Sequence, residues 1–141
     1  MNKIGIDERI FIAGGYGMVG SAIYRRLIFL KYGLKNGQIL RPSKKTLDLL
    51  NKTQVDEWFK KNKPTVVIIA AARVGGILAN DSYPYDFIFE NLRIQTNIID
   101  ASWRNGVKRL LFLGSSCIYP KLCSQPIKEE YLLNGQLEET N

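Results

Sequence analysis

The sequence contains no histidine and only two cysteines among its 141 residues. A Ser-His-Asp triad needs a histidine, and a Cys/His zinc site needs more ligands, so this chain by itself supports neither chemistry, and no metal site is expected. Two cysteines are also too few for a disulfide framework, which favours a reducing compartment. Charged residues at 7–9 precede the first apolar run, and that run stops at glycines, so it is neither a signal peptide nor a membrane span. We therefore expect a cytoplasmic protein.

Negative charge is scarce in the first half of the sequence. Residues 1–70 carry 13 Lys and Arg but only five Asp and Glu, whereas residues 71–141 carry seven and eight, for a formal net charge of +7 overall. The basic half predicts an anionic partner, which from charge alone could be nucleic acid, a membrane surface or a phosphorylated cofactor. A solvated basic face is the alternative interpretation.

Short apolar runs alternate with helical patterns along the chain. The helical patterns cover residues 18–32, 53–61 and 84–104, and the last has side chains at spacings of three and four: Phe87, Ile88, Asn91, Leu92, Gln95, Ile98 and Ile99. The apolar runs predict strands buried on both faces at residues 9–13, 65–70 and 109–113, with a weaker strand at 38–41. This alternation predicts an α/β fold, a Rossmann-like, doubly wound parallel sheet.

Glycines at positions 14, 17 and 20 follow the first predicted strand and open the first helix. In a dinucleotide-binding turn, the first glycine makes the tight turn, the second lets a pyrophosphate approach the backbone, and the third allows close packing. A sharp turn without a ligand is the alternative. The predicted cofactor-binding residues of this turn are Gly14, Gly15, Tyr16, Gly17, Met18, Val19 and Gly20.

The end of the second predicted strand lacks the acidic residue that binds the ribose 2′-hydroxyl of NAD. Arg41 and Lys44 stand there instead, which favours the 2′-phosphate of NADP(H), although solvated loop charge would give the same pattern. We expect Asp48 and Leu49 to lie along the adenine.

The third and fourth predicted strands end in small and polar residues, at the sheet edge where ligands of open α/β sheets bind. Ala71 leaves room for the cofactor, and Ser115 can hydrogen-bond a substrate oxygen. Cys117 is a candidate general acid or base, with a buried, inert cysteine as the alternative. The predicted cofactor contacts after the fourth strand are Leu113, Gly114, Ser115 and Ser116.

Three blocks together resemble the GDP-L-fucose synthases, a family of extended short-chain dehydrogenases. They are the glycine turn, the Val-Gly-Gly-Ile block at 74–77 and the Gly-Ser-Ser-Cys-Ile-Tyr-Pro block at 114–120. The resemblance implies an NADP-dependent enzyme that epimerises C3 and C5 of GDP-4-keto-6-deoxy-D-mannose and reduces C4. It also implies that Cys117 takes part in the proton exchange and that Ser115 orients the ketone.

The sequence departs from this family in three respects. None of its tyrosines is followed four residues later by lysine, the family's histidine is absent, and Tyr16 stands where the family usually has arginine. We therefore expect an amino-terminal portion, as a fragment or a natural truncation. It would be one incomplete NAD(P)-binding domain over residues 1–141, inactive alone, with residues 121–141 forming a loop.

The resemblance implies a GDP-sugar as partner, with no nucleic acid and no membrane. It also implies a homodimer of the full-length enzyme that uses the helix at 84–104. Two alternatives stay open: another NAD(P)-dependent nucleotide-sugar epimerase or dehydratase, which would not need the cysteine at 117, and a truncated noncatalytic NADP-binding module.

Overall fold

A computed structural model describes residues 4–33 and 37–140 of the chain. Two compact units are present. Unit 1 comprises the residues up to Arg73 together with Phe89–Leu113, and unit 2 comprises Val74–Ile88 and the residues from Gly114 onward. The elements in chain order are β1 (Arg9–Ala13), α1 (Met18–Phe29), β2 (Gln38–Leu40), α2 (Lys52–Asn62), β3 (Val66–Ile69), α3 (Ile77–Ser82), α4 (Pro84–Arg104), β4 (Arg109–Phe112) and the 3₁₀ turns η1 (Ser116–Ile118) and η2 (Glu129–Tyr131).

Unit 1 contains a four-stranded parallel sheet with strand order β2-β1-β3-β4. Phe11 of β1 pairs with Leu40 of β2 on one side and with Val67 of β3 on the other, and Ile69 of β3 pairs with Phe112 of β4. Helical connections join successive strands, as parallel pairing requires. The predicted Rossmann-like parallel sheet is confirmed.

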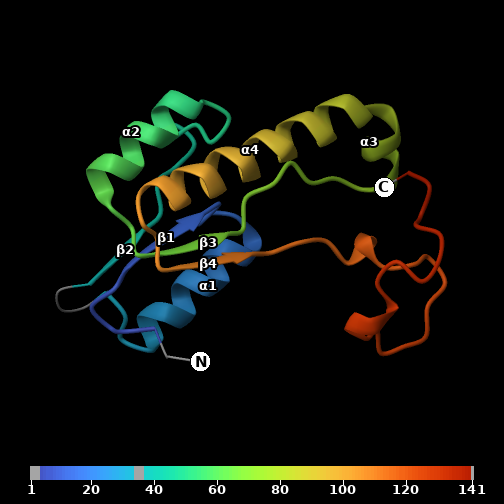
Figure 1. The fold of residues 1–141 in the computed structure, drawn as a ribbon, viewed down its shortest axis with the longest axis horizontal. Coiled ribbons are helices and arrows are strands. Elements are labelled where there is room, and N and C mark those ends of the chain that lie inside the picture. Colours follow the sequence, from blue (N-terminus) through green and yellow to red (C-terminus); the bar gives the residue numbers. More distant parts are fainter. Residues whose placement is uncertain (1–3, 34–36, 141) are drawn as a thin grey trace. The chain divides into compact units, whose positions relative to one another are not determined.

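The sheet has an apolar core on each face, because β1 and β3 are buried from both sides. Helices α2 and α4 cover one face and α1 covers the other (Figure 1). The core under α2 and α4 contains Phe11, Leu47, Val55, Phe59, Val67, Ile69, Ile94, Ile98 and Ala101. The core under α1 contains Ile10, Ile12, Val66 and Ile68, against which Ile23, Tyr24 and Leu27 pack.

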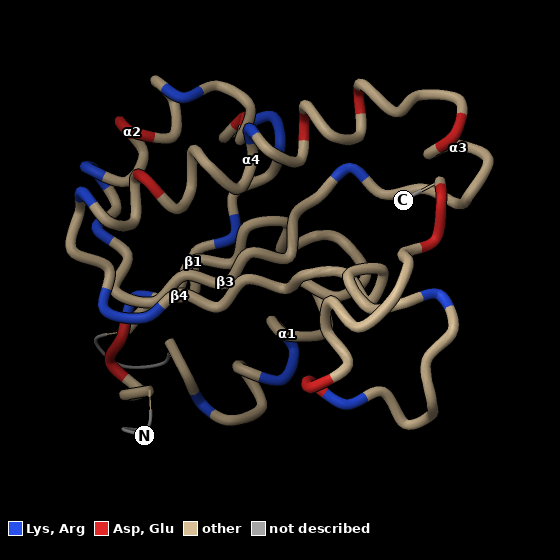
Figure 2. Tube along the Cα trace, turned by 45° about the vertical axis from the view of Figure 1, so that its right-hand side comes forward, with Lys and Arg blue, Asp and Glu red and all other residues tan. Residues whose placement is uncertain are grey.

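Local sequence explains the bounds of α2. The Asn51 side chain caps its first turn by accepting a hydrogen bond from the amide of Gln54 at 3.1 Å. Lys60 and Lys61 lie in the last turn, where cations suit the helix dipole, and Lys63 ends the helix in the left-handed region with φ of +44°. Figure 2 shows both basic and acidic positions on α2, and further Lys and Arg positions on α1.

The expectation that residues 109–113 are buried on both faces is wrong. β4 lies at the edge of the described sheet and pairs only with β3 there. Leu111 is 52% exposed, and Leu110, Phe112 and Leu113 are exposed as well. The apolar run identifies the strand correctly, but burial needs neighbours on both faces, and β4 lacks them in the described part of the chain.

The apolar pattern of α4 is also only partly buried. Ile94, Asn97, Ile98 and Ala101 face the sheet, whereas Ile88, Leu92 and Ile99 are exposed, although they share the spacing of the pattern. The helix has apolar side chains on two faces, so spacing alone does not identify the inner one.

Unit 2 contains α3, the first turn of α4, and the two 3₁₀ turns. Helix α3 has no counterpart in the sequence-based expectation. Residues 121–140 form η2 and otherwise turns and irregular backbone, held in part by the amide of Lys121, which donates to the carbonyl oxygen of Gln136 at 2.9 Å. Among the described residues, no helix combines the length and apolarity that crossing a membrane requires.

Candidate cofactor-binding site

The glycine turn connects β1 to α1, and backbone contacts within the protein require two of its glycines, Gly14 and Gly20. Gly14 has φ of +76°, which glycine adopts freely, and a Cβ there would lie 2.6 Å from the carbonyl oxygen of Ala70. A Cβ at Gly20 would clash with the carbonyl oxygen of Gly14. Both glycines therefore let the start of α1 lie close to the ends of β1 and β3.

Gly17 differs, because its backbone conformation does not require glycine. Its φ of −71° and ψ of 174° are open to any residue. Gly17 is exposed, and a Cβ there would meet a single atom within 4 Å, the carbonyl oxygen of Gly14 at 3.3 Å. A small shift relieves one such contact. The absent side chain leaves an open surface where a ligand can approach the backbone.

The same surface includes the amino-terminal end of α1. Gly17 is the N-cap of this 12-residue helix, and it provides no side-chain hydrogen bond to the first turn. The first amides of a helix have no partner within the helix, so the N–H groups of Met18 and Val19 can donate to an anion. The helix dipole adds a favourable positive potential at this end.

Arg41 follows β2 and lies beside the glycine turn. Its guanidinium carbon is 3.6 Å from the centroid of the Tyr24 ring and 4.6 Å from the centroid of the Tyr16 ring. Among the described residues, no hydrogen bond or ion pair uses the Arg41 side chain. Lys44 is exposed three residues further on. The structure thus brings one predicted cation of the site to the predicted phosphate-binding turn.

Asp48 and Leu49 take part in contacts within the protein. The Asp48 carboxylate accepts a hydrogen bond from the amide of Leu50 at 3.0 Å. Leu49 packs against the core under α2, and its carbonyl oxygen accepts from the side-chain amide of Asn97 at 2.9 Å. Contact of either residue with an adenine stays a prediction.

Asn91 of α4 is a residue of the site region that the sequence did not single out for function. Its side-chain oxygen accepts from the amide of Arg73 at 2.7 Å, and its side-chain nitrogen donates to the Arg73 carbonyl at 3.0 Å. Glu90 pairs with the Arg73 guanidinium at 2.6 Å. These contacts fix the backbone two residues after Ala71, whose Cα would lie 2.9 Å from a Cβ at Gly14. The signal available in the sequence was that Asn91 is a polar residue within the apolar pattern of this helix.

The predicted catalytic residues belong to unit 2. Ser115 is the N-cap of η1, and its hydroxyl oxygen accepts a hydrogen bond from the amide of Cys117 at 3.1 Å. Ser115, Ser116 and Cys117 are all exposed, so the alternative in which Cys117 is buried is wrong. A role of Cys117 in proton exchange stays a prediction. Leu113, by contrast, belongs to unit 1, where its amide donates to the carbonyl oxygen of Ile69.

An ion-pair network joins α2 to α4 in unit 1. The Lys52 ammonium contacts the carboxylates of Asp56 and Asp100 at 3.0 and 2.7 Å, and Arg104 pairs with both carboxylates. The hydrogen bond from Lys52, followed by that from Arg104, lowers the pKa of the Asp100 carboxyl. Within the described residues, no group of three or more His, Cys, Asp or Glu side chains is placed to hold a metal ion.

Comparison with known proteins identifies the family of this chain and several relatives. Residues 10–141 match the NAD-dependent epimerase/dehydratase family. The chain is 52% identical over 134 residues to GDP-L-fucose synthase of Sinorhizobium fredii, covering 95% of this chain and 41% of that protein. It is also 52% identical to GDP-L-fucose synthase 1 of Arabidopsis thaliana, covering 96% of this chain and 41% of the relative. The chain thus spans about two fifths of the length of these relatives.

A solved structure shows the same fold. The GDP-mannoheptose C4 reductase of Campylobacter jejuni with NADP bound has a TM-score of 0.88 and 38% sequence identity to this chain. The match covers 98% of this chain and 42% of that protein.

Proposed function

Because the chain belongs to the NAD-dependent epimerase/dehydratase family, we propose that it forms the NADP(H)-binding part of a GDP-L-fucose synthase. Such an enzyme epimerises C3 and C5 of GDP-4-keto-6-deoxy-D-mannose and then reduces C4 to give GDP-L-fucose. The identity to two GDP-L-fucose synthases over nearly the whole chain supports this choice.

The proposal that unit 1 binds a dinucleotide rests on Gly17. Gly14 and Gly20 are explained by contacts within the protein, whereas Gly17 has an unstrained backbone and one tight neighbour. A ligand that lies against this backbone explains why no side chain stands there. The uncapped amides of α1 beside it suit the negative charge of a pyrophosphate.

The residues after β2 support NADP(H) rather than NAD(H). Arg41 places a guanidinium next to the glycine turn with no carboxylate partner among the described residues. A guanidinium can donate two parallel N–H groups to a phosphate, which gives both charge and geometric specificity. Lys44 adds a second cation nearby in sequence. A relative with NADP bound is consistent with this choice.

The chemistry that we assign to unit 2 uses Ser115 and Cys117. When bound, NADPH supplies the hydride that reduces the C4 ketone. The ketone acidifies the C–H bonds at C3 and C5, and the Cys117 Sγ exchanges these protons, because a thiol ionises far more readily than a hydroxyl. The Ser115 hydroxyl oxygen accepts a hydrogen bond from the amide of Cys117, so the Ser115 O–H can itself donate to the ketone oxygen.

We also propose that the complete enzyme is a homodimer that uses the outer face of α4. Leu92, Ile99 and Trp103 are exposed there at spacings of seven and four, which aligns them along the helix. Trp103 is 85% exposed. Large apolar side chains aligned on one exposed face are typical of a protein interface.

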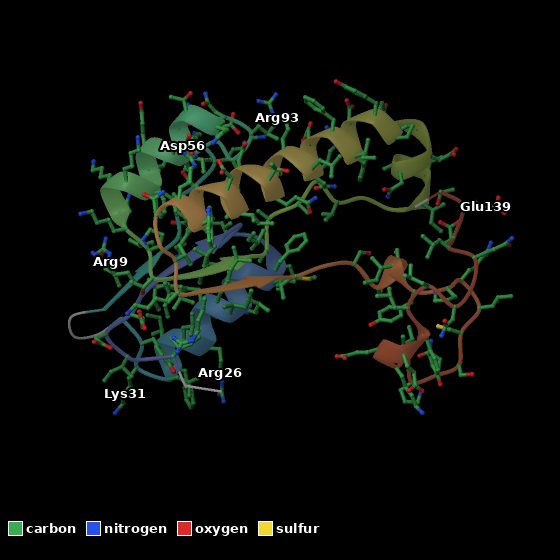
Figure 3. All side chains as sticks on the ribbon, viewed as in Figure 1. Arg9, Arg26, Lys31, Asp56, Arg93 and Glu139 are labelled. Carbon is green, nitrogen blue, oxygen red and sulfur yellow. The ribbon has the colours of Figure 1, made fainter. Side chains whose placement is uncertain are left out.

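Titration of the chain with NADPH and NADH tests the cofactor assignment. A charge-assisted contact contributes about 1.5–3 kcal/mol, so Arg41→Ala should weaken NADPH binding at least about tenfold and leave NADH binding nearly unchanged. Arg26→Ala is the matched control, because Arg26 also lies over an aromatic ring, that of Phe29 at 5.2 Å, but in the last turn of α1 (Figure 3).

Two outcomes would contradict the assignment. Equal affinities of the unmutated chain for NADPH and NADH would refute the preference for NADP(H). Equal losses of both cofactors in Arg41→Ala would show that Arg41 acts on the fold of the turn rather than on the 2′-phosphate.

A further inference from the structure

We propose that Tyr16 and Tyr24 form an aromatic clamp that holds Arg41 in position and thereby sets the preference for NADP(H) over NAD(H). This inference rests on the proposed function, because it concerns the 2′-phosphate of the same cofactor. It adds two residues of α1 and its preceding turn to the determinants of specificity.

Both rings lie within cation–π distance of the guanidinium. The Arg41 guanidinium carbon is 3.6 Å from the Tyr24 centroid and 4.6 Å from the Tyr16 centroid, and such contacts are attractive up to about 6 Å. Tyr24 is half-buried and packs against the core under α1, so its ring is a fixed platform. Tyr16 is 63% exposed and reaches Arg41 from the glycine turn.

Gly15 provides independent support for a fixed position of Arg41. It is buried, and a Cβ there would lie 2.6 Å from the Cβ and 3.5 Å from the Cδ of Arg41. The aliphatic part of Arg41 therefore occupies the space that any other residue at position 15 would fill. Three residues of the turn and of α1 thus contact one arginine along its length.

Such a clamp leaves the N–H groups of Arg41 free for an anion. The donors of a guanidinium lie in its plane, whereas a stacked ring covers a face. Within the described part of the chain, neither a carboxylate nor a carbonyl uses these donors. A long side chain that is already held loses less conformational freedom on binding, which favours the ligand that it contacts.

The clamp acts on one cofactor more than on the other. The 2′-phosphate of NADPH is charged and accepts two N–H donors, whereas the 2′-hydroxyl of NADH is neutral. Loosening Arg41 should therefore weaken NADPH binding and leave NADH binding almost unchanged. A purely structural role of the tyrosines would affect both cofactors alike.

The test compares ring-removing with ring-retaining variants in titrations of NADPH, NADH and 2′,5′-ADP. Tyr16→Leu should weaken NADPH and 2′,5′-ADP about two- to fivefold, as expected for an exposed cation–π contact. Tyr24→Leu, with the closer ring, should weaken them about five- to thirtyfold. Tyr16→Phe and Tyr24→Phe should stay within about twofold of the unmutated chain, because the ring is retained.

Phe29→Leu is the matched control, since it removes an exposed ring that lies under another arginine of α1, Arg26. It should change none of the three affinities. Thermal unfolding, monitored by circular dichroism, identifies any variant that has lost its fold. This check matters most for Tyr24→Leu, because Tyr24 packs against the core. Tyr16 is largely exposed, so Tyr16→Leu tests the clamp even if Tyr24→Leu does not fold.

The outcomes separate the clamp from the proposed function. The clamp is refuted, and the proposed function stays intact, if the unmutated chain prefers NADPH and Arg41→Ala loses that preference while Tyr16→Leu keeps it. Losses in Tyr16→Phe as large as in Tyr16→Leu also refute it, because the hydroxyl would then be the contact. An unmutated chain that binds neither dinucleotide refutes both proposals.

Discussion

At the scale of single residues, each glycine of the turn that follows β1 is present for a different physical reason. Gly14 is required by its positive φ, Gly20 by packing and Gly15 by the Arg41 side chain. Gly17 has the ordinary backbone conformation of an N-cap, so the fold does not require glycine there, and we attribute its presence to the proposed ligand. A substitution at Gly17 therefore separates ligand binding from folding.

We predict that Gly17→Val abolishes binding of NADPH and NADH while the sheet stays folded. A branched side chain at this position would occupy the surface that the pyrophosphate approaches. Gly76→Val is a close control, because Gly76 is also an N-cap, with φ of −74° and ψ of 178°, and a Cβ there meets no atom within 4 Å. Binding titrations beside circular dichroism measure both effects. A folded Gly17→Val chain that still binds the dinucleotides would show that the turn is only structural.

At the scale of elements, the contact between α2 and α4 includes a network of exposed charges. Asp100 has a pKa below its ordinary value because Lys52 and then Arg104 donate hydrogen bonds to its carboxylate. A carboxyl whose pKa is lower in the folded than in the unfolded chain contributes stability above the unfolded pKa, about 3.9 for aspartate. That contribution is lost as the pH falls through the lowered, folded pKa.

We therefore predict that the free energy of unfolding decreases as the pH is lowered below about 4, and less so in Asp100→Asn. Glu57→Gln on α2 is the control, because Glu57 takes part in none of the ion pairs of the described residues. Denaturant titrations across this pH range give the comparison. Added salt should reduce the difference, since all four charges are accessible to solvent. Identical pH dependence in Asp100→Asn and the unmutated chain would mean that the network contributes no stability.

At the scale of the whole molecule, the sequence of 141 residues contains the proposed cofactor site but no Tyr-x-x-x-Lys motif. We predict that the chain by itself binds NADPH without reducing GDP-4-keto-6-deoxy-D-mannose. A chimera with the remaining part of the Sinorhizobium fredii relative fused after residue 141 should reduce it. General acid–base groups contribute typically about 10²–10⁴-fold in rate, so their absence should bring the rate below detection. Turnover by the unfused chain would refute this prediction.

In the same chimera, Cys117→Ser should suppress exchange of the C3 and C5 protons with deuterated solvent. A serine hydroxyl is a much poorer base than a thiolate near neutral pH. Cys123→Ser is the control, because Cys123 is the other free cysteine of the chain. Nuclear magnetic resonance of the sugar follows the exchange. An unchanged exchange rate in Cys117→Ser would remove Cys117 from the proposed mechanism.

The proposed dimer is also a property of the whole molecule. Trp103→Glu in the chimera should shift sedimentation from dimer to monomer, because a carboxylate would be buried without a partner in an apolar interface. Leu122→Glu is a control for an exposed apolar residue elsewhere, since Leu122 is 92% exposed. A dimer that is unaffected by Trp103→Glu would exclude this face of α4.

Sequence by itself determined the alternation of the four strands with helices α1, α2 and α4, and the position of the glycine turn, but not helix α3. Those features are local: short apolar runs of about four to six residues indicate strands, and glycines next to a strand indicate a sharp turn into a helix. The cations after β2 could also be read directly, because the position that normally carries an acid in NAD sites has a fixed place in the motif.

Only the tertiary structure decided which apolar residues are buried and which residues surround Arg41. The apolar runs of β4 and α4 indicate a capacity for burial, but burial depends on neighbours that distant segments must provide, and Leu111 and Leu92 remain exposed. Tyr24 lies 17 residues before Arg41 in the sequence, and no periodic pattern links the two. Parallel pairing of β1 with β2 brings them together, because it places the end of β2 beside the turn that follows β1.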